Sequence, residues 1–302
     1  MMRATRRIAL CTLAGLLGAG CDPEGSERAA GGPAPSVDAS EVPSAAAPKP
    51  GQFVQPPRPA FDPNPLKLPG VAPTIAADSL VYTVPRHVLE TARVGSSFVL
   101  HAATAEGVEG GNVIVHIGHD ASYPVHPAYV LVPPHGTLRR GGAVLAPHRG
   151  QLGHAVVVAL KRDLATVHYT DVGPGYGDQP LPVRDVAPQG PGLVPGNYAL
   201  VADGEVVRQV LLLSGGTHAD GKRRWLALGY AGEVSLVEEE RLQPVPLDFQ
   251  PKVGAVVAVP WLGAMVPGRV TAVDPRGIFT VRRARVAPPL FFGPGMLMPA
   301  GK

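Results

Sequence analysis

Short apolar runs rich in β-branched residues recur along the chain from about residue 68, and Gly, Pro or Asp bounds each of them. Runs of this length, separated by turn-forming residues, predict β-strands joined by hairpins. The predicted strands lie at 97–102, 112–117, 129–132, 143–146, 155–160, 165–169, 197–201, 206–213, 224–228, 255–259, 268–273 and 277–281. A helical turn is expected only in the stretch PRHVLETA at 85–92, so the pattern predicts an all-β chain.

The strands recur in groups. Four stretches open on a glycine before an apolar strand, at Gly95, Gly142, Gly196 and Gly254. Four stretches also close on an aliphatic residue with a proline two places later: Leu131/Pro133, Val186/Pro188, Leu242/Pro244 and Val286/Pro288. Self-similarity at a period of about fifty residues indicates a repeat architecture.

Several segments in these groups share a motif. They are Gly142–Ala146 and Val167–Gly173 in the second group, Leu226–Gly232 in the third, and Gly254–Ala258, Trp261, Val270–Val273 and Ile278–Val281 in the fourth. The motif resembles that of tudor/agenet-type SH3-like barrels, although the first group matches only at its ends and the fourth lacks the D-x-G element. The resemblance implies tandem small SH3-like barrels at 67–136, 137–192, 193–251 and 252–302. One or two larger β-sandwiches with similar strands are the alternative.

The N-terminus has a basic head of Arg3, Arg6 and Arg7, then an uncharged apolar run from Ile8 to Gly20, then Cys21. The run is too short to span ~30 Å of hydrocarbon at ~1.5 Å per residue. The segment resembles a bacterial lipoprotein signal peptide, although Gly18 stands where that family usually has Leu. The resemblance implies that residues 1–20 are removed, that Cys21 is lipidated, and that the lipid anchors the protein to a membrane of the bacterial cell envelope, on the periplasmic side or at the cell surface.

Residues 21–66 are rich in Pro and Ala and contain few large apolar side chains. Such a segment cannot bury enough surface to offset its chain entropy. We expect a disordered linker whose prolines favour an extended spacer. A Pro-rich ligand for another module is the alternative.

Charge and cysteine content narrow the function classes. The chain has 27 Lys+Arg and 24 Asp+Glu, and removal of the three N-terminal arginines leaves 24 of each. A chain without net charge gains little long-range attraction to phosphate, so no nucleic-acid partner is expected. Both cysteines, Cys11 and Cys21, lie in the N-terminal segment, which excludes thiolate chemistry from the folded part.

Candidate ligand-binding side chains follow from the barrel resemblance. Tudor-like barrels that bind methylated cations do so with a cage of aromatic rings and an acid. The candidates are His148, Tyr169, Asp171 and Tyr176 in the second unit, and Trp261 and Phe279 in the fourth. The alternative is that these rings fill the ends of the barrels.

Motifs for metal binding and catalysis are missing from the sequence. His116 and His119 are three residues apart, so on a strand they point to opposite faces. The chain contains no H-E-x-x-H and no G-x-S-x-G, and no paired carboxylates stand out near a histidine. We therefore expect no metal, no cofactor and no enzyme. The expected function is a non-enzymatic binding or scaffold lipoprotein; the alternative is an SH3-type cell-wall-binding or hydrolase-accessory module.

The last two units differ in charge. Residues 252–302 carry seven Lys+Arg and one acid, Asp274, whereas residues 193–251 carry eight acids and five bases. Strand alternation places Arg283 and Arg285 on one face and Arg282 on the other. We expect Arg283 and Arg285 to face outward near Trp261 and to contact an anionic envelope polymer or a protein partner. Pairing with the acidic third unit is the alternative.

Overall fold

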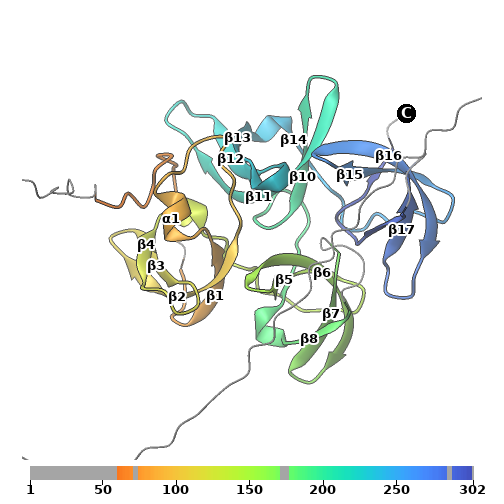
Figure 1. Ribbon diagram of the computed structural model, residues 1–302, viewed down its shortest axis with the longest axis horizontal. Helices are drawn as coiled ribbons and strands as arrows, with labels where there is room; N and C mark the ends of the chain where they lie inside the picture. The colour runs from red at the N-terminus through yellow and green to blue at the C-terminus, as the bar shows by residue number, and fades with distance from the viewer. Residues whose placement is uncertain (1–59, 71–73, 171–176, 284–287, 301–302) are drawn as a thin grey trace, which may run out of the picture. The chain divides into compact units, whose positions relative to one another are not determined.

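The computed structural model describes residues 60–70, 74–170, 177–283 and 288–300 (Figure 1). In these ranges the protein is all-β, which confirms the predicted fold class. The one α-helix there is α1 (Arg86–Leu89), within the predicted helical turn. The signal peptide, Cys21 and most of the linker lie outside the described residues, as do Asp171, Tyr176 and Arg285.

One strand pattern occurs four times (Figure 1). Four consecutive antiparallel strands are followed by a short fifth segment that pairs with the first strand. We call these repeats the first (residues 79–131), second (143–188), third (198–244) and fourth (256–299) modules. Pairing between the fourth strand and the fifth segment is not present among the described residues, so each sheet is open there.

The strands of the modules have the following bounds. The first module contains β1 (Ser79–Thr83), β2 (His101–Glu109), β3 (Asn112–His116) and β4 (Tyr123–Val125), and Leu131 returns to pair with Tyr82. The second contains β5 (Ala143–His148), β6 (Gln151–Lys161), β7 (Leu164–Tyr169), β8 (Gln179–Pro182) and β9 (Ala187–Pro188). The third contains β10 (Tyr198–Asp203), β11 (Val206–Thr217), β12 (Arg223–Leu228), β13 (Val234–Glu238) and β14 (Leu242–Pro244). The fourth contains β15 (Val256–Trp261), β16 (Ala264–Val273), β17 (Phe279–Arg282), β18 (Leu290–Phe292) and β19 (Met298–Pro299).

The second strand of every module is bulged. The register shifts fall at Ala105/Gly107, Val157/Ala159, Leu212/Ser214 and Val270/Ala272. A bulge bends a strand and increases its twist. The same device at the same place lets each small sheet curl around its own apolar side chains.

Strand alternation gives the third module two buried faces. On β12, Trp225 and Ala227 point into the module's own core. Leu226 and Leu228 point the other way, into a larger cluster that contains the core of the first module. Because successive side chains of a strand face opposite sides, one strand serves both cores. The third module is therefore packed against the first through its sheet.

The first module departs from the predicted pattern. Its first strand is β1, and the stretch around Gly95 lies instead between α1 and β2. There Ser97 bridges Glu233 of the third module, and the amide of Phe98 donates to the carbonyl of Gly232 at 2.9 Å. The prediction of a strand over 97–102 is therefore wrong before His101, because that backbone pairs with another module.

The fourth module closes later than its sequence pattern suggested. The fifth strand that pairs with β15 is β19, Met298–Pro299. The expected closing residue Val286 lies outside the described residues. Leu297 and Pro299 have the same aliphatic and proline spacing, so two stretches of this module carry the closing pattern.

Further contacts join the second module to its neighbours. Its sheet meets that of the first module through the pair His101 and Gln151 on β2 and β6. The imidazole Nε2 of His154 lies 2.9 Å from the carbonyl oxygen of Gly196, which precedes the third module. A Cβ at Gly196 would stand 2.4 Å from Leu145, so the backbone approaches the second module closely there.

Candidate binding site at the module junction

A cavity of about 600 Å³ lies where side chains from all four modules and their connections converge. Phe98 and Leu100 come from the segment before β2, Leu152 and His154 from β6, and Tyr198, Gln209 and Leu211 from β10 and β11. The turn Gly229–Gly232 and two stretches of the fourth module, 260–263 and 290–292, complete the wall. The volume falls in the range of small-molecule sites.

Two tight turns form the part of the cavity wall that is most exposed to solvent. Leu262 and Gly263 both have positive φ, 48° and 84°, in the hairpin between β15 and β16. This pair of left-handed residues is the geometry of a type I′ turn. A Cβ at Gly263 would lie 3.0 Å from the Cβ of Tyr230, so the hairpin meets the turn after β12 there.

The rim of the cavity is apolar and open to solvent. The exposed fractions are 46% for Val99, 58% for Tyr230, 65% for Leu262 and 40% for Phe291. Single exposed apolar residues are ordinary, but several around one hollow mark an interaction site. This rim draws on three modules or their connections, so it exists only when they are assembled.

Few polar groups face the cavity. His154 is 4% exposed, and its ring stacks on Tyr198 with centroids 4.3 Å apart. The amide Nε2 of Gln209 is buried and has no hydrogen-bond partner among the described residues. Within those same residues no Asp, Glu, Lys or Arg lines the wall. A buried amide without a partner costs free energy, so an acceptor placed in the cavity would satisfy it.

A cation lies beside this wall. The guanidinium of Arg283 stacks on the ring of Trp261, 3.5 Å from its centroid. The Nε of Arg283 is buried without a hydrogen-bond partner in the described ranges. Arg282, the last residue of β17, is exposed, whereas Arg283 is half-buried. The expectation that Arg283 faces outward and Arg282 inward is therefore reversed, because Phe279 and Val281 fix the inward face of β17.

Of the other predicted ligand residues in the described ranges, Tyr169 and Phe279 lie in module cores, and His148 is half-buried beside Tyr169. The rings of His148 and Tyr169 are 4.4 Å apart, but Tyr169 is 3% exposed and its hydroxyl donates to the carbonyl of Pro147. Phe279 is 1% exposed in the core of the fourth module. These rings fill the module interiors and do not meet Trp261 in a cage. Sequence motifs could not reveal Tyr230, Phe291 and Gln209 as wall residues, because module packing alone brings them together.

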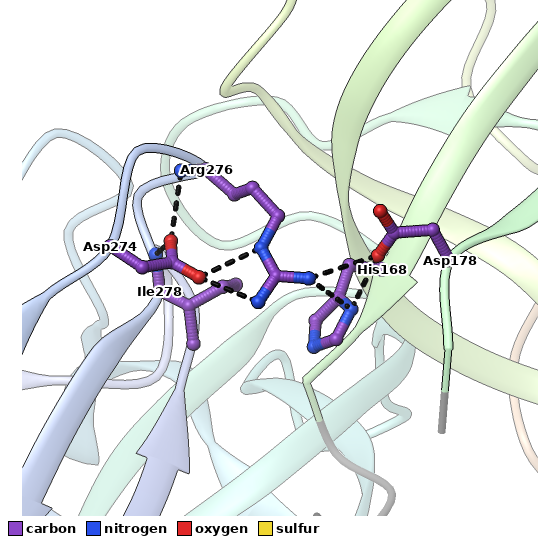
Figure 2. Close-up of polar contacts among 5 residues, drawn as sticks. All are labelled: His168, Asp178, Asp274, Arg276 and Ile278. Carbon is purple, nitrogen blue, oxygen red and sulfur yellow. Dashed lines mark hydrogen bonds and ion pairs between the residues drawn. The ribbon is translucent and has the colours of Figure 1, made fainter. Parts of the chain in front are cut away.

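An arginine joins the second and fourth modules (Figure 2). Arg276, in the turn after β16, places Nη1 3.0 Å from Oδ1 of Asp178 and 3.1 Å from Nδ1 of His168. Its Nε donates to Oδ2 of Asp274 at 2.7 Å. Nearby, a Cβ at Gly293 would stand 2.6 Å from the side chain of Thr170, a cavity residue. The Arg276 contacts therefore link the fourth module to the second.

Hydrogen bonds fix the charge states around Arg276. Burial alone would raise the pKa of Asp274, but the amide of Ile278 and the side chain and amide of Arg276 donate to its carboxylate and lower the pKa below 3.8. The hydrogen bond to Asp274 raises the pKa of Arg276. The Asp274 carboxylate and the Arg276 guanidinium both stay ionised at neutral pH, so the ion pair between them is permanent.

No protein-family model matches the chain, and no curated protein matches it either. Over the described ranges, no group of three or more His, Cys, Asp or Glu side chains could hold a metal ion. No helix in the described part of the chain is long and apolar enough to cross a membrane.

Proposed function

We propose that the protein is a non-enzymatic binding lipoprotein of the bacterial envelope that takes up its ligand in the junction cavity. The observation that carries the proposal is the cavity itself, about 600 Å³ in volume with an exposed apolar rim. Its described wall offers apolar surface and a few hydrogen-bonding groups, an arrangement typical of recognition sites. The SH3-like modules serve as the frame of the site.

The proposed attachment to the membrane rests on the sequence. The basic head, the short apolar run and Cys21 support a lipid anchor, and the Pro/Ala-rich stretch after it supports a spacer. Replacement of Cys21 by Ser is expected to release the protein from the membrane fraction. Equal membrane fractionation of the variant and the unmodified protein would contradict the anchor.

Uptake of a neutral apolar probe tests the cavity. N-phenyl-1-naphthylamine, added to the full chain carrying Cys21→Ser so that no lipid competes, should fluoresce on binding and quench Trp261. Leu262→Asp should weaken probe binding on the order of tenfold, because a charge at the rim must lose hydration when the site fills.

Val253→Asp is the matched control. Val253 is 63% exposed in the same part of the chain but does not line the cavity. The control should bind the probe as the unmodified chain does. Absence of probe binding, or equal weakening in both variants, would refute the proposed site.

A second candidate is binding of an anionic envelope polymer, as in a cell-wall-binding or hydrolase-accessory module. Arg283 against Trp261 supports it, because a cation beside an aromatic ring suits an anionic glycan. Its binding should weaken as salt rises, since exposed charges are screened beyond ~10 Å at ~0.1 M. Salt-independent binding would refute this candidate.

A further inference from the structure

We infer that the ligand of the junction cavity is a single-chain apolar carboxylate, with its chain in the cavity and its carboxylate on Arg283. The ligand class rests on the proposed function, because it concerns the same cavity. Three features support it: an uncharged apolar lining, an arginine stacked on the wall residue Trp261 whose Nε has no partner, and a buried amide donor.

The lining selects an apolar body. Leu100, Leu152, Leu211 and Leu228 supply aliphatic surface, and Phe292 adds an aromatic ring. A charged group inserted among them would lose hydration without gaining a partner from the described wall. Each methylene moved from water into such a site contributes about 0.8 kcal/mol.

The arginine selects the head group. The face of the Arg283 guanidinium is covered by Trp261, so its N–H donors remain available only in the plane of the group. Nε–H and a neighbouring Nη–H form a parallel pair that matches the two oxygens of a carboxylate. Nε is buried and unpaired, and no carboxylate of the described residues forms an ion pair with Arg283. A buried, unpartnered donor on a cation favours an anion as its partner.

The neighbouring groups favour a small ligand over a polymer. A polymer with repeated charges would need a row of exposed cations that continues from Arg283, whereas Arg282 and its cross-strand partner Arg269 lie on the other face of the sheet and Arg276 is already paired with Asp274 and Asp178. Gln209 provides a further donor inside the cavity, which suits a hydroxyl or carbonyl group on the ligand chain.

Displacement of N-phenyl-1-naphthylamine by matched carboxylates and alcohols tests the ligand class. The protein is the full chain with Cys21→Ser, and the competitors are octanoate, decanoate and dodecanoate with the alcohols of equal length, all below micelle formation. Dodecanoate should bind on the order of tenfold more tightly than dodecanol, as expected for a charge-assisted hydrogen bond. Affinity should rise roughly fourfold per methylene, the equivalent of about 0.8 kcal/mol.

Arg283→Met keeps an unbranched apolar side chain against Trp261 and removes the charge. It should abolish the preference for the carboxylate and leave dodecanol binding within about twofold. Arg282→Met removes an adjacent, exposed arginine and should keep the preference. Retained uptake of the neutral probe by each variant shows that its cavity is intact.

The outcomes separate the two proposals. If the neutral probe binds but carboxylate and alcohol bind the unmodified chain equally, the ligand class is wrong and the binding site stands. If the probe does not bind, both are wrong. The carboxylate proposal would also be wrong if Arg282→Met and Arg283→Met lost the preference for the carboxylate equally. It would likewise be wrong if isolated anionic wall polymer displaced the probe more strongly than dodecanoate at equal charge.

Discussion

The third and fourth modules share one strand pattern but use their charges differently. In the third, the acids pair with bases of the same module: Lys222 with Glu238, Arg224 with Asp220 and Glu238, and Arg223 with Glu239. In the fourth, Arg276 reaches Asp178 of the second module, and Arg283 lies on Trp261. No ion pair joins the third and fourth modules within the described residues. The bases of the third module are thus paired within it while its excess of acids remains, whereas the fourth module directs Arg276 to a neighbouring module.

The two modules also attach to the assembly differently. Main-chain pairing around Ser97 and Glu233 and a shared apolar cluster join the third module to the first. The fourth contacts the second through the side chain of Arg276 and the close approach at Gly293, and it packs on the third through a small apolar cluster of Leu200, Val245 and Met298. Separation of the first and third modules would expose their shared apolar cluster to water and break backbone hydrogen bonds, whereas a partly exposed ion pair is replaced by water at low cost. The third module should therefore be the harder one to detach.

The largest expected effect is that of Gly232→Ala at the contact between the third and first modules. Gly232 has φ +77°, and a Cβ there would stand 2.1 Å from the carbonyl oxygen of Phe98. The backbones would have to separate, so the free energy of unfolding should fall by about 3 kcal/mol or more. Urea unfolding measures the loss, and probe uptake by the cavity should fall with it.

Gly221→Ala is the matched control for this prediction. Gly221 lies in the same module with φ +78°, and nothing stands within 4 Å of an added Cβ. It should lose about 1 kcal/mol from backbone strain alone. Equal losses in the two variants would show that the contact with Phe98 does not determine stability.

A smaller effect is expected at the ion pair of Arg276 and Asp178, which joins the second and fourth modules. A double-mutant cycle with Arg276→Met and Asp178→Asn should give a coupling of about 0.5–1 kcal/mol, since both side chains are 35% exposed and solvent screens them. The same cycle on the more exposed pair Arg208–Asp203 in the third module should give less. A larger coupling in the third module would reverse the comparison.

The smallest effect is expected on the stability of the fold at acid pH. The pKa of Asp274 lies below 3.8, so it stabilises the fold above that pH, and its contribution disappears as the pH falls through its folded value. The hydrogen bond from Lys222 lowers the pKa of Glu238 below 4.5. The stabilising contribution of Glu238 likewise disappears as the pH falls through its folded pKa. Unfolding temperature against pH, measured for Asp274→Asn and Glu238→Gln, should show less acid sensitivity in both. At about 1 M salt, where the Debye length is ~3 Å, only the Asp274 effect should persist, because backbone amides bind that carboxylate. Loss of both effects in salt would contradict this distinction.

Local pattern predicts the first three strands of the second, third and fourth modules, but it misses β4, β8, β13 and β18 and does not reveal which strands pair. The strand predicted at 129–132 is wrong: a 3₁₀ turn at Pro127–Tyr129 is followed there by a single bridge at Leu131. The runs at 155–160 and 206–213 lie within β6 and β11, because alternation and turn residues are properties of the segment itself. The sequence pattern does not predict β1, because the glycine and apolar residues around Gly95 match the pattern expected at the start of a module. Whether residues 97–100 pair within their own module depends on Glu233, far along the chain, and no local pattern carries that information.

The site was less accessible to sequence reasoning than the fold. Trp261 and Arg283 were expected to lie close together, and they are in contact. The sequence predicts aromatic ligand-binding residues at His148, Tyr169 and Phe279. An aromatic residue in a strand, however, looks the same in a sequence whether it faces a core or a ligand. The cavity rim depends on how four modules pack, so Tyr230 and Phe291 could be assigned to it only with the structure.

The bridge between Ser97 and Glu233 has a consequence for biosynthesis. Residues of the first module leave the ribosome early, yet the backbone partner of Ser97 is made only after the second module and most of the third. A nascent or truncated chain that ends before Leu226 therefore presents an unpaired backbone edge beside apolar side chains that Leu226 and Val234 normally cover. Such contacts between distant parts of a chain form late and slowly, so premature termination should yield aggregating fragments rather than small folded proteins.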